Sequence, residues 1–188
     1  MEKIKRLAVR QILDSFEYGQ TFQVMGWVRT KRISKNVAFV TLNDGSTIHN
    51  LQVEVDVTVF TEDLLTRINT GAGLSVEGIL MESAGSGQMV ELAASRIVLL
   101  GEADPDQYPL QPKKHSLEFL REIAHLRFRT STFSAVARVR HAMIFAIHQF
   151  FTERGFYNIH TPIITASDAE GAGEMFKVTT LDLHRLPH

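Results

Sequence analysis

Residues 21–57 read TFQVMGWVRTKRISKNVAFVTLNDGSTIHNLQVEVDV and decide the fold of the first part of the chain. The segment contains three runs rich in β-branched and apolar residues, at 21–32, 37–43 and 51–57. In the third run an apolar residue stands at every second position, which is the period of a strand with one buried face. Asn43-Asp44-Gly45 predicts a hairpin turn, because these residues tolerate positive φ. The segment therefore predicts three consecutive strands.

The sequence after this segment predicts one helix and two more strands. A helix is expected over 60–69, where Thr61 can cap the first turn and Gly71 can stop the last one. Alternating runs at 74–82 and 89–100 predict the strands. Three strands, a helix and two strands within about 80 residues is the order of an OB-fold, a small all-β Greek-key barrel. Another small barrel or a half-open sandwich without a ligand has the same order and stays an alternative.

A change of composition near residues 101–112 divides the chain. β-branched alternation stops there and an acidic, Pro-containing segment begins. We therefore predict a barrel domain over 1–101, a linker over 102–130 and a further domain over 131–188. Ser116 is expected to cap a helix that runs to about Leu126. A longer helix is expected over 134–153, and its apolar surface is wider than one stripe, so more than one of its sides must be covered.

Composition excludes several classes of protein. The 188 residues include 20 Lys and Arg, 21 Asp and Glu, and no Cys, with a formal net charge of -1. These numbers exclude a generally basic nucleic-acid coat, disulfides and thiolate metal sites. No apolar run reaches the roughly 18 residues of a membrane span, and no secretory signal follows the first residues. We expect a cytoplasmic protein with no membrane partner and no metal site of its own.

A basic stretch stands at the end of the first predicted strand. Residues 29–35 read RTKRISK and contribute Arg29, Arg32 and Lys35 as candidate phosphate ligands at the mouth of the barrel. Taken alone, such a stretch is equally typical of a solvated strand end. Phe39 favours nucleic acid: if its two neighbours along the strand face the core, its ring lies on the outer face, where it can stack on an unpaired base. The opposite register would make Phe39 a core residue.

Two polar residues on later strands complete the candidate interface. Gln52 offers both donors and an acceptor to a base edge, and Glu91 can accept hydrogen bonds from the N–H groups of a guanine. Each alone is typical of a solvated strand residue. The nucleic-acid interpretation therefore depends on the basic stretch, Phe39 and the OB-fold, and Gln52 and Glu91 gain weight only within that fold.

The most specific segment lies near the C-terminal end. Residues 150–164, FFTERGFYNIHTPII, follow a long helix and resemble motif 1 of class II aminoacyl-tRNA synthetases. An OB-fold ahead of this motif narrows the resemblance to the aspartyl, asparaginyl and lysyl subgroup. Residues 108–129, YPLQPKKHSLEFLREIAHLRFR, and 167–178, SDAEGAGEMFKV, look like the asparaginyl-tRNA synthetases in particular. The resemblance covers nearly the whole chain from about Thr21, and it implies that residues 131–188 are the first helix and strand of a truncated α+β class II catalytic domain.

The resemblance assigns roles to the candidate residues. It implies that Phe39 stacks on the middle anticodon base and that Gln52 hydrogen-bonds the same base. It implies that Glu91 reads the first anticodon base, a guanine, and that Arg32 contacts the anticodon stem-loop. Arg29 and Lys35 are weaker candidates for the same contact.

The resemblance also assigns roles in the C-terminal part. Glu170, Gly171 and Ala172 match a mobile loop that closes over the amino acid, in which the Glu holds the α-ammonium group. Without the resemblance, this segment reads as an acidic, Gly-rich surface turn. Arg154, Gly155, Phe156 and Pro162 match motif 1, which forms the dimer interface of the family, so a homodimer is expected.

The family activates its amino acid with ATP and Mg²⁺ and then transfers it to tRNA. The resemblance thus implies a whole enzyme that ligates asparagine to the tRNA that reads asparagine codons. Motifs 2 and 3 of the family are not found in these 188 residues, so we expect no catalytic residue, no adenylation activity and no tightly bound cofactor in the chain itself. Part of an aspartyl-tRNA synthetase, a free-standing OB-fold nucleic-acid-binding module and a naturally short regulatory protein are the alternatives.

Overall fold

The computed structural model describes residues 4–15, 17–83, 85, 87–166, 176 and 178–182. The chain divides into two compact units, residues 1–141 and 142–188, and each is described by itself. The division falls inside a helix and follows compactness alone. The domain boundaries expected at residues 101 and 130 therefore stay a prediction.

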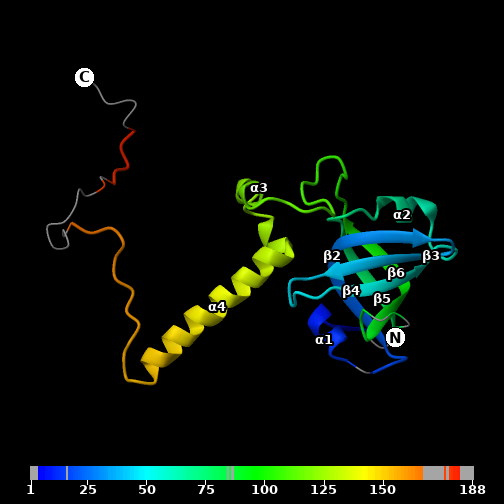
Figure 1. The fold of residues 1–188 in the computed structure, drawn as a ribbon, viewed down its shortest axis with the longest axis horizontal. Coiled ribbons are helices and arrows are strands. Elements are labelled where there is room, and N and C mark those ends of the chain that lie inside the picture. Colours follow the sequence, from blue (N-terminus) through cyan, green and yellow to red (C-terminus); the bar gives the residue numbers. More distant parts are fainter. Residues whose placement is uncertain are drawn as a thin grey trace. The chain divides into compact units, whose positions relative to one another are not determined.

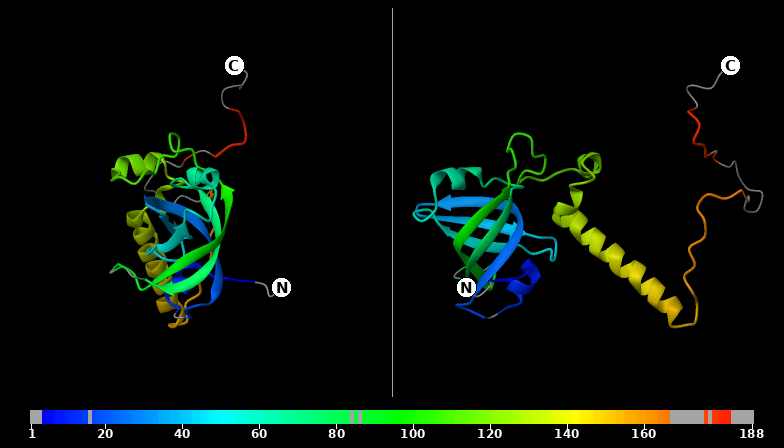
Figure 2. Two further views of the ribbon diagram at one scale, coloured as in Figure 1. Left: turned by 90° about the vertical axis from the view of Figure 1, so that its right-hand side faces the viewer. Right: turned by 180° about the vertical axis from the view of Figure 1, so that it is seen from behind.

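Five strands of the first unit form a closed barrel, the OB-fold that the sequence predicts (Figure 1). The strands are β2 (Thr21–Ser34), β3 (Val37–Asn43), β4 (Leu51–Asp56), β5 (Gly73–Glu82) and β6 (Val90–Gly101). They follow the order β2-β3-β4-β6-β5, and β2 closes the ring by pairing with β5 from Thr21 opposite Ile79 to Trp27 opposite Gly73. The pairing of β4 with β6 is parallel, and the other pairings of the ring are antiparallel. Figure 2 shows the closed sheet from two further sides.

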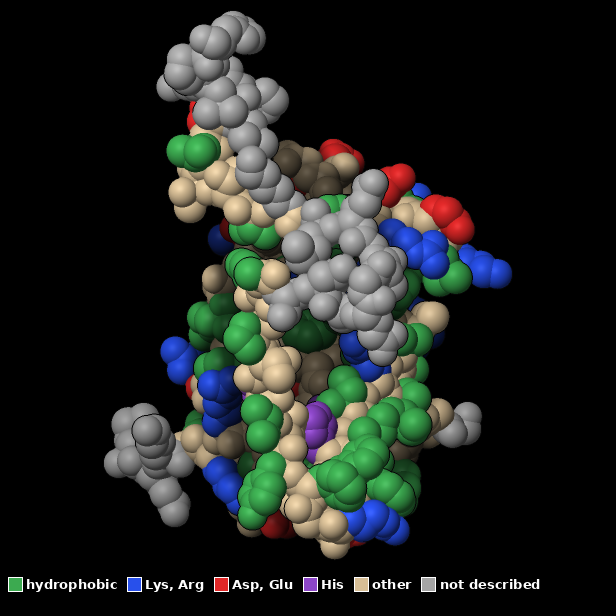
Figure 3. Space-filling model, turned by 90° about the vertical axis from the view of Figure 1, so that its left-hand side faces the viewer, with side chains coloured by type: hydrophobic (Ala, Val, Ile, Leu, Met, Phe, Trp, Pro, Cys, Tyr) green, Lys and Arg blue, Asp and Glu red, His purple; other side chains and the backbone are tan. Residues whose placement is uncertain are grey.

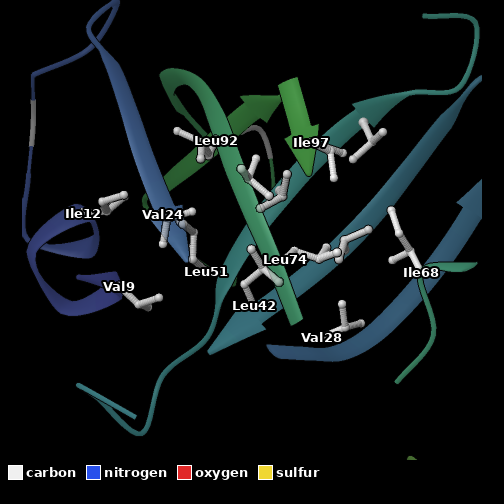
Figure 4. Packing of buried hydrophobic residues seen from close by; sticks show 14 of the residues in the cluster. Val9, Ile12, Val24, Val28, Leu42, Leu51, Ile68, Leu74, Leu92 and Ile97 are labelled. Atoms are coloured by element: carbon white, nitrogen blue, oxygen red, sulfur yellow. The ribbon is translucent and has the colours of Figure 1, made fainter. Parts of the chain in front are cut away.

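Every second residue along the strands faces inward, and these residues form the barrel core. On β4, Leu51, Val53 and Val55 are completely buried, and the residues between them are not. The labelled side chains of Figure 4 come from all five strands, from α1 (Val9–Leu13) and from Ile68, the residue that follows α2 (Glu62–Arg67), and they belong to one apolar cluster. The same alternation that predicts the strands thus produces one continuous apolar core.

Two short elements ahead of the barrel, β1 (Lys5–Arg6) and α1 (Val9–Leu13), are absent from the sequence-based prediction. Both apolar residues of α1 at the barrel side, Val9 and Ile12, are completely buried. The N-terminus of α1 is capped from another part of the chain, because Asp44 Oδ2 accepts a hydrogen bond of 2.9 Å from the Val9 N–H. The N-cap position of α1 is Ala8, whose side chain cannot accept a hydrogen bond, so the usual N-cap signal is missing from the sequence.

The connection between β3 and β4 is longer than the predicted hairpin turn. The turn does begin at Asn43-Asp44-Gly45, and Gly45 has a φ of +82°, but residues 44–50 all lie between the strands. The Asn43 side chain organises this loop, since its amide group donates to the carbonyl oxygen of His49 at 2.9 Å. A side chain that bonds across the loop therefore replaces the tight turn.

The linker packs against the barrel through three aromatic and charged contacts. Gly71 has a φ of +93°, and a Cβ atom there would lie 2.6 Å from the Tyr108 ring. The Arg129 guanidinium lies 4.9 Å from the centre of the Trp27 ring. Arg29 Nη1 donates a hydrogen bond to the carbonyl oxygen of Arg129. These contacts fix both ends of the linker to the barrel.

The helix expected after Ser116 is shorter than predicted. Ser116 caps α3 (Leu117–Glu122) by accepting from the Phe119 N–H at 3.2 Å, as expected, but the helix stops at Glu122. A 3-10 turn, η1 (Arg127–Arg129), then leads into the long helix α4 (Ser131–Thr152), which starts three residues before the predicted position.

α4 carries apolar residues that are exposed. Within the described part of the chain, no residue of α4 is buried. The exposed large apolar residues of α4 are Val136, Val139, Met143, Ile144, Phe145, Ile147, Phe150 and Phe151. The space-filling view of Figure 3 shows hydrophobic side chains gathered on an exposed surface. Among the described residues, no helix combines the length and the apolar character needed to cross a bilayer.

Candidate nucleic-acid interface

Three of the candidate residues lie on neighbouring strands, on the outer face of the barrel. Arg32 of β2 pairs with Phe39 of β3. Phe39 in turn pairs with Glu54 of β4, and the next outward pair on these strands is Thr41 with Gln52. Phe39, Thr41, Gln52 and Glu54 alternate with buried residues, so they share the outer face, and Arg32 lies on that face because it pairs with Phe39. The pairing thus brings Arg32, Phe39 and Gln52 together.

Phe39 has the register that favours base stacking. Ala38 and Val40 on either side of it are buried in the core, whereas the Phe39 ring is half-buried on the outside. The register predicted for Phe39 is therefore confirmed. The Arg32 guanidinium lies 5.3 Å from the centre of the Phe39 ring, a cation–π distance. The pair combines a flat apolar surface with an exposed positive charge, which suits a base and its phosphate.

Glu91 lies on the same face but is covered. Gln52 and Glu91 each stand one residue before the paired Val53 and Leu92 of β4 and β6, so they are neighbours across the parallel pair. Glu91 is only 6% exposed, and its Oε1 accepts a hydrogen bond from the Ser83 hydroxyl. The carboxylate is oriented by this contact, and a base reaches it only at its small exposed edge or by displacing Ser83.

Arg29 does not join this group. A β-bulge between Val28 and Thr30 changes the register of β2, and the Arg29 side chain turns to the linker, where it donates to the Arg129 carbonyl oxygen. Desolvation by burial lowers the pKa of Arg29 below its ordinary value. Lys35 is exposed in the β2–β3 turn with a φ of +49°. Of the cations in the basic stretch 29–35, Arg32 and Lys35 are therefore the exposed ones.

Lys31, inside the same stretch, has a structural contact. Its Nζ donates a hydrogen bond of 2.7 Å to the carbonyl oxygen of Leu65 in α2, and burial lowers its pKa. Thr41 and Glu54 share the outer face with Phe39 and Gln52, and the sequence reasoning missed both. Strand alternation, counted outward from Phe39 and Gln52, is the signal that finds them.

The motif 1 residues lie at and beyond the end of α4. Gly155 has a φ of +81° and ends the helix, with its N–H donating to the Thr152 carbonyl oxygen at 3.0 Å. Arg154 lies over the Phe150 ring, 3.6 Å from its centre, and Phe156 packs edge-on against Phe151. Pro162 is exposed in a segment that is neither helix nor strand. Glu170, Gly171 and Ala172 lie outside the described residues.

Two family descriptions match separate parts of the chain. "OB-fold nucleic acid binding domain" matches residues 22–100, which contain the barrel and the candidate interface. "tRNA synthetases class II (D, K and N)" matches residues 116–186, which contain α3, α4 and motif 1. The order of the two matches is the order that the sequence predicts.

Curated relatives that match this chain include asparagine–tRNA ligases. Asparagine–tRNA ligase of Parabacteroides distasonis is 59% identical over 186 residues, which is 99% of this chain and 40% of the relative. The chain is a homologue of the asparaginyl-tRNA synthetases. Asparagine–tRNA ligase of Cytophaga hutchinsonii is 57% identical over 96% of this chain and 39% of its own length. The chain thus spans about two fifths of the length of these asparaginyl relatives.

Solved structures support the fold. Asparaginyl-tRNA synthetase from Pyrococcus horikoshii, solved with asparaginyl-adenylate, gives a TM-score of 0.80 at 21% identity and covers 94% of this chain and 41% of that one. Aspartyl-tRNA synthetase from Entamoeba histolytica gives 0.68 at 20% identity, with 85% of this chain and 39% of that one covered. At these identities the likeness supports the fold alone, a barrel followed by helices that resemble the start of a class II catalytic domain.

Proposed function

We propose that this chain binds the anticodon arm of the asparagine-specific tRNA through the outer face of its barrel. The observation that supports the proposal most directly is the row of Arg32, Phe39 and Gln52 on three paired strands, in a domain that is homologous to asparagine–tRNA ligases. This row places a cation, an aromatic ring and an amide side by side. A single-stranded base needs these three groups for its phosphate, its flat face and its edge.

Each residue has one role in the proposed complex. Phe39 stacks on the middle anticodon base, a uridine, and Gln52 hydrogen-bonds the edge of that base. Glu91 accepts from the N–H groups of the first base, a guanine, and Ser83 holds the carboxylate in position for it. Arg32 contacts the backbone phosphate, and Lys35 adds positive charge at the turn.

The whole protein is proposed to ligate asparagine to this tRNA in the cytoplasm. ATP and Mg²⁺ supply the activation chemistry when they are bound. In the chain itself, Glu170, Gly171 and Ala172 are proposed to close over the amino acid. The exposed apolar residues of α4 and the motif 1 residues Arg154, Gly155, Phe156 and Pro162 are proposed to form the homodimer interface, which would remove the apolar surface from water.

The test is binding of the 188-residue chain to three anticodon stem-loops at one fixed salt concentration. The first carries GUU, the second GUC, and the third has the middle U replaced. We expect the chain to prefer GUU to both of the others. Preference for GUC would indicate aspartate specificity, which the asparaginyl relatives do not favour. Equal binding of all three loops would contradict the roles of Phe39, Gln52 and Glu91.

A further inference from the structure

A cavity of about 830 Å³ lies between the outer side of β2 and β3 and the linker. Val28, Arg29, Thr30 and Thr41 form its barrel side, and residues 110–117 form much of the opposite side. All of its lining residues belong to the first compact unit. Its size is in the range of sites that bind small ligands or a part of a larger one.

The charged side chains that line this cavity are all positive. Three cations, Arg29, Lys113 and Lys114, line it together with His115 and seven Ser or Thr hydroxyl groups. None of its lining residues is an Asp or a Glu, although the chain as a whole carries 21 of them. Cations and hydroxyl groups without carboxylates are the side chains that bind phosphate oxygens.

The two lysines stand on a loop that is fixed to the barrel side. Gln111 Nε2 donates to the carbonyl oxygen of Tyr108 at 2.8 Å, and the His115 ring nitrogen lies 3.1 Å from the carbonyl oxygen of Gln111. The His115 ring also stacks on Phe119, with centres 5.2 Å apart. Tyr108 packs against Gly71. The loop is thus held in place before any ligand binds, which lowers the entropy cost of binding.

The first turn of α4 adds to the positive potential of the cavity. Ser131 and Thr132 line the cavity, and Thr130 caps the helix by accepting from the Phe133 N–H at 3.3 Å. The N-terminus of a long helix carries a partial positive charge. This contribution reinforces the side-chain cations on the opposite wall.

The cavity is continuous with the reading face of the barrel. Thr30 and Thr41 line the cavity, and their hydroxyl oxygens are 2.7 Å apart. Thr41 pairs directly with Gln52, and Thr30 stands two residues before Arg32 on the same strand. A strand of nucleic acid that lies on Phe39 and Gln52 therefore reaches the cavity within a short distance.

We propose that this cavity binds the phosphodiester backbone of the same RNA strand whose bases lie on Phe39 and Gln52. Lys113 and Lys114 contact the phosphate oxygens, and Arg29 with the first turn of α4 provides a fixed positive wall. The proposal rests on the proposed anticodon-binding function and extends it from the barrel to the linker. Contacts to phosphates add affinity without sequence preference, so the linker contributes strength and the barrel contributes discrimination.

The test compares the double variant Lys113→Gln, Lys114→Gln with the unchanged chain and with the double variant Lys5→Gln, Arg6→Gln. Lys5 and Arg6 are exposed cations on β1 and do not line the cavity, so this control removes the same number of charges. Binding of the GUU, GUC and U-replaced stem-loops is measured over a series of salt concentrations. We expect the double variant to bind all three loops about tenfold more weakly, with a slope of log affinity against log salt that is smaller by about one to two. The preference for GUU should not change.

The outcomes separate this inference from the proposed function. An unchanged slope and affinity in the double variant would overturn the phosphate site, even if the chain prefers GUU. A reduced slope in the double variant without any preference for GUU would support the phosphate site and overturn the anticodon reading. Tight binding of inorganic pyrophosphate that the double variant loses, with RNA affinity unchanged, would identify a site for a free anion and overturn the RNA assignment.

Discussion

Large apolar side chains are buried in the barrel and exposed in α4. In the barrel, Val24, Leu42 and Leu74 are completely buried by other strands of the same sheet. In α4, Val139 is 64% and Phe145 is 67% exposed. Burying an apolar side chain contributes about 1.5–3 kcal/mol, so the barrel is stabilised by its own strands, whereas the apolar surface of α4 gains this energy only when a partner covers it. The difference indicates that the barrel is the part that folds on its own contacts.

The largest effect is expected from a cavity in the barrel. Leu74→Ala should lower the free energy of unfolding by about 2–5 kcal/mol, because Leu74 is completely buried in the core. Denaturant unfolding followed by the fluorescence of Trp27, the single Trp of the chain, measures this loss. A loss below 1 kcal/mol would show that the barrel core relaxes around the missing side chain.

The second effect concerns the outer face of the barrel. Phe39→Ala should weaken binding of the GUU stem-loop by about 1–3 kcal/mol, the usual contribution of stacking on one base. The unfolding midpoint should change little, because the ring is only half-buried and lies outside the core. Titration at fixed salt gives the affinity, and an unchanged affinity would remove Phe39 from the interface.

The third effect concerns the contact between the β3–β4 loop and α1. Asp44→Ala should lower the free energy of unfolding by about 0.5–2 kcal/mol, since it removes the acceptor that caps α1. Asp44→Asn is the matched variant, because it keeps one acceptor oxygen and removes the charge. If both variants unfold like the unchanged chain, the cap contributes nothing.

The charge of Asp44 also gives a pH dependence. Burial acts to raise the pKa of Asp44, but hydrogen bonds from Ser46 and the Val9 N–H outweigh it, and the pKa lies below its ordinary value. A lowered folded pKa means that the charged form is preferred in the folded state. The stabilisation is therefore complete above the unfolded pKa of about 3.9 and is lost as the pH falls through the folded value. Asp44→Asn should flatten this part of the stability curve.

The smallest effect on unfolding is expected in α4. Met143→Ser should change the free energy of unfolding of the barrel by less than about 0.5 kcal/mol, because Met143 is exposed. The same variant should reduce self-association measured by sedimentation, if a second copy covers this helix. A large loss of barrel stability would contradict the contrast between the two regions.

The sequence predicts the barrel because each strand carries its own alternation, and it predicts the register of Phe39 from the two apolar neighbours. It fails where a contact depends on distant residues. The cap of α1 comes from Asp44, 35 residues away, and the bulge at Arg29 moves this side chain from the reading face to the linker. The hydrogen bond that holds Glu91 comes from Ser83, across the β5–β6 turn. Contacts between distant elements determine these positions, and the local sequence pattern cannot predict such contacts.

The order of the strands has a consequence for synthesis on the ribosome. β2 pairs with β5 and β4 pairs with β6, so the first three strands leave two open edges until the last two strands are available. The barrel cannot close before residue 101 has left the exit tunnel. Until then, the nascent chain exposes strand edges that pair readily with other chains. The last strand to be translated is therefore the one that protects the emerging domain from aggregation.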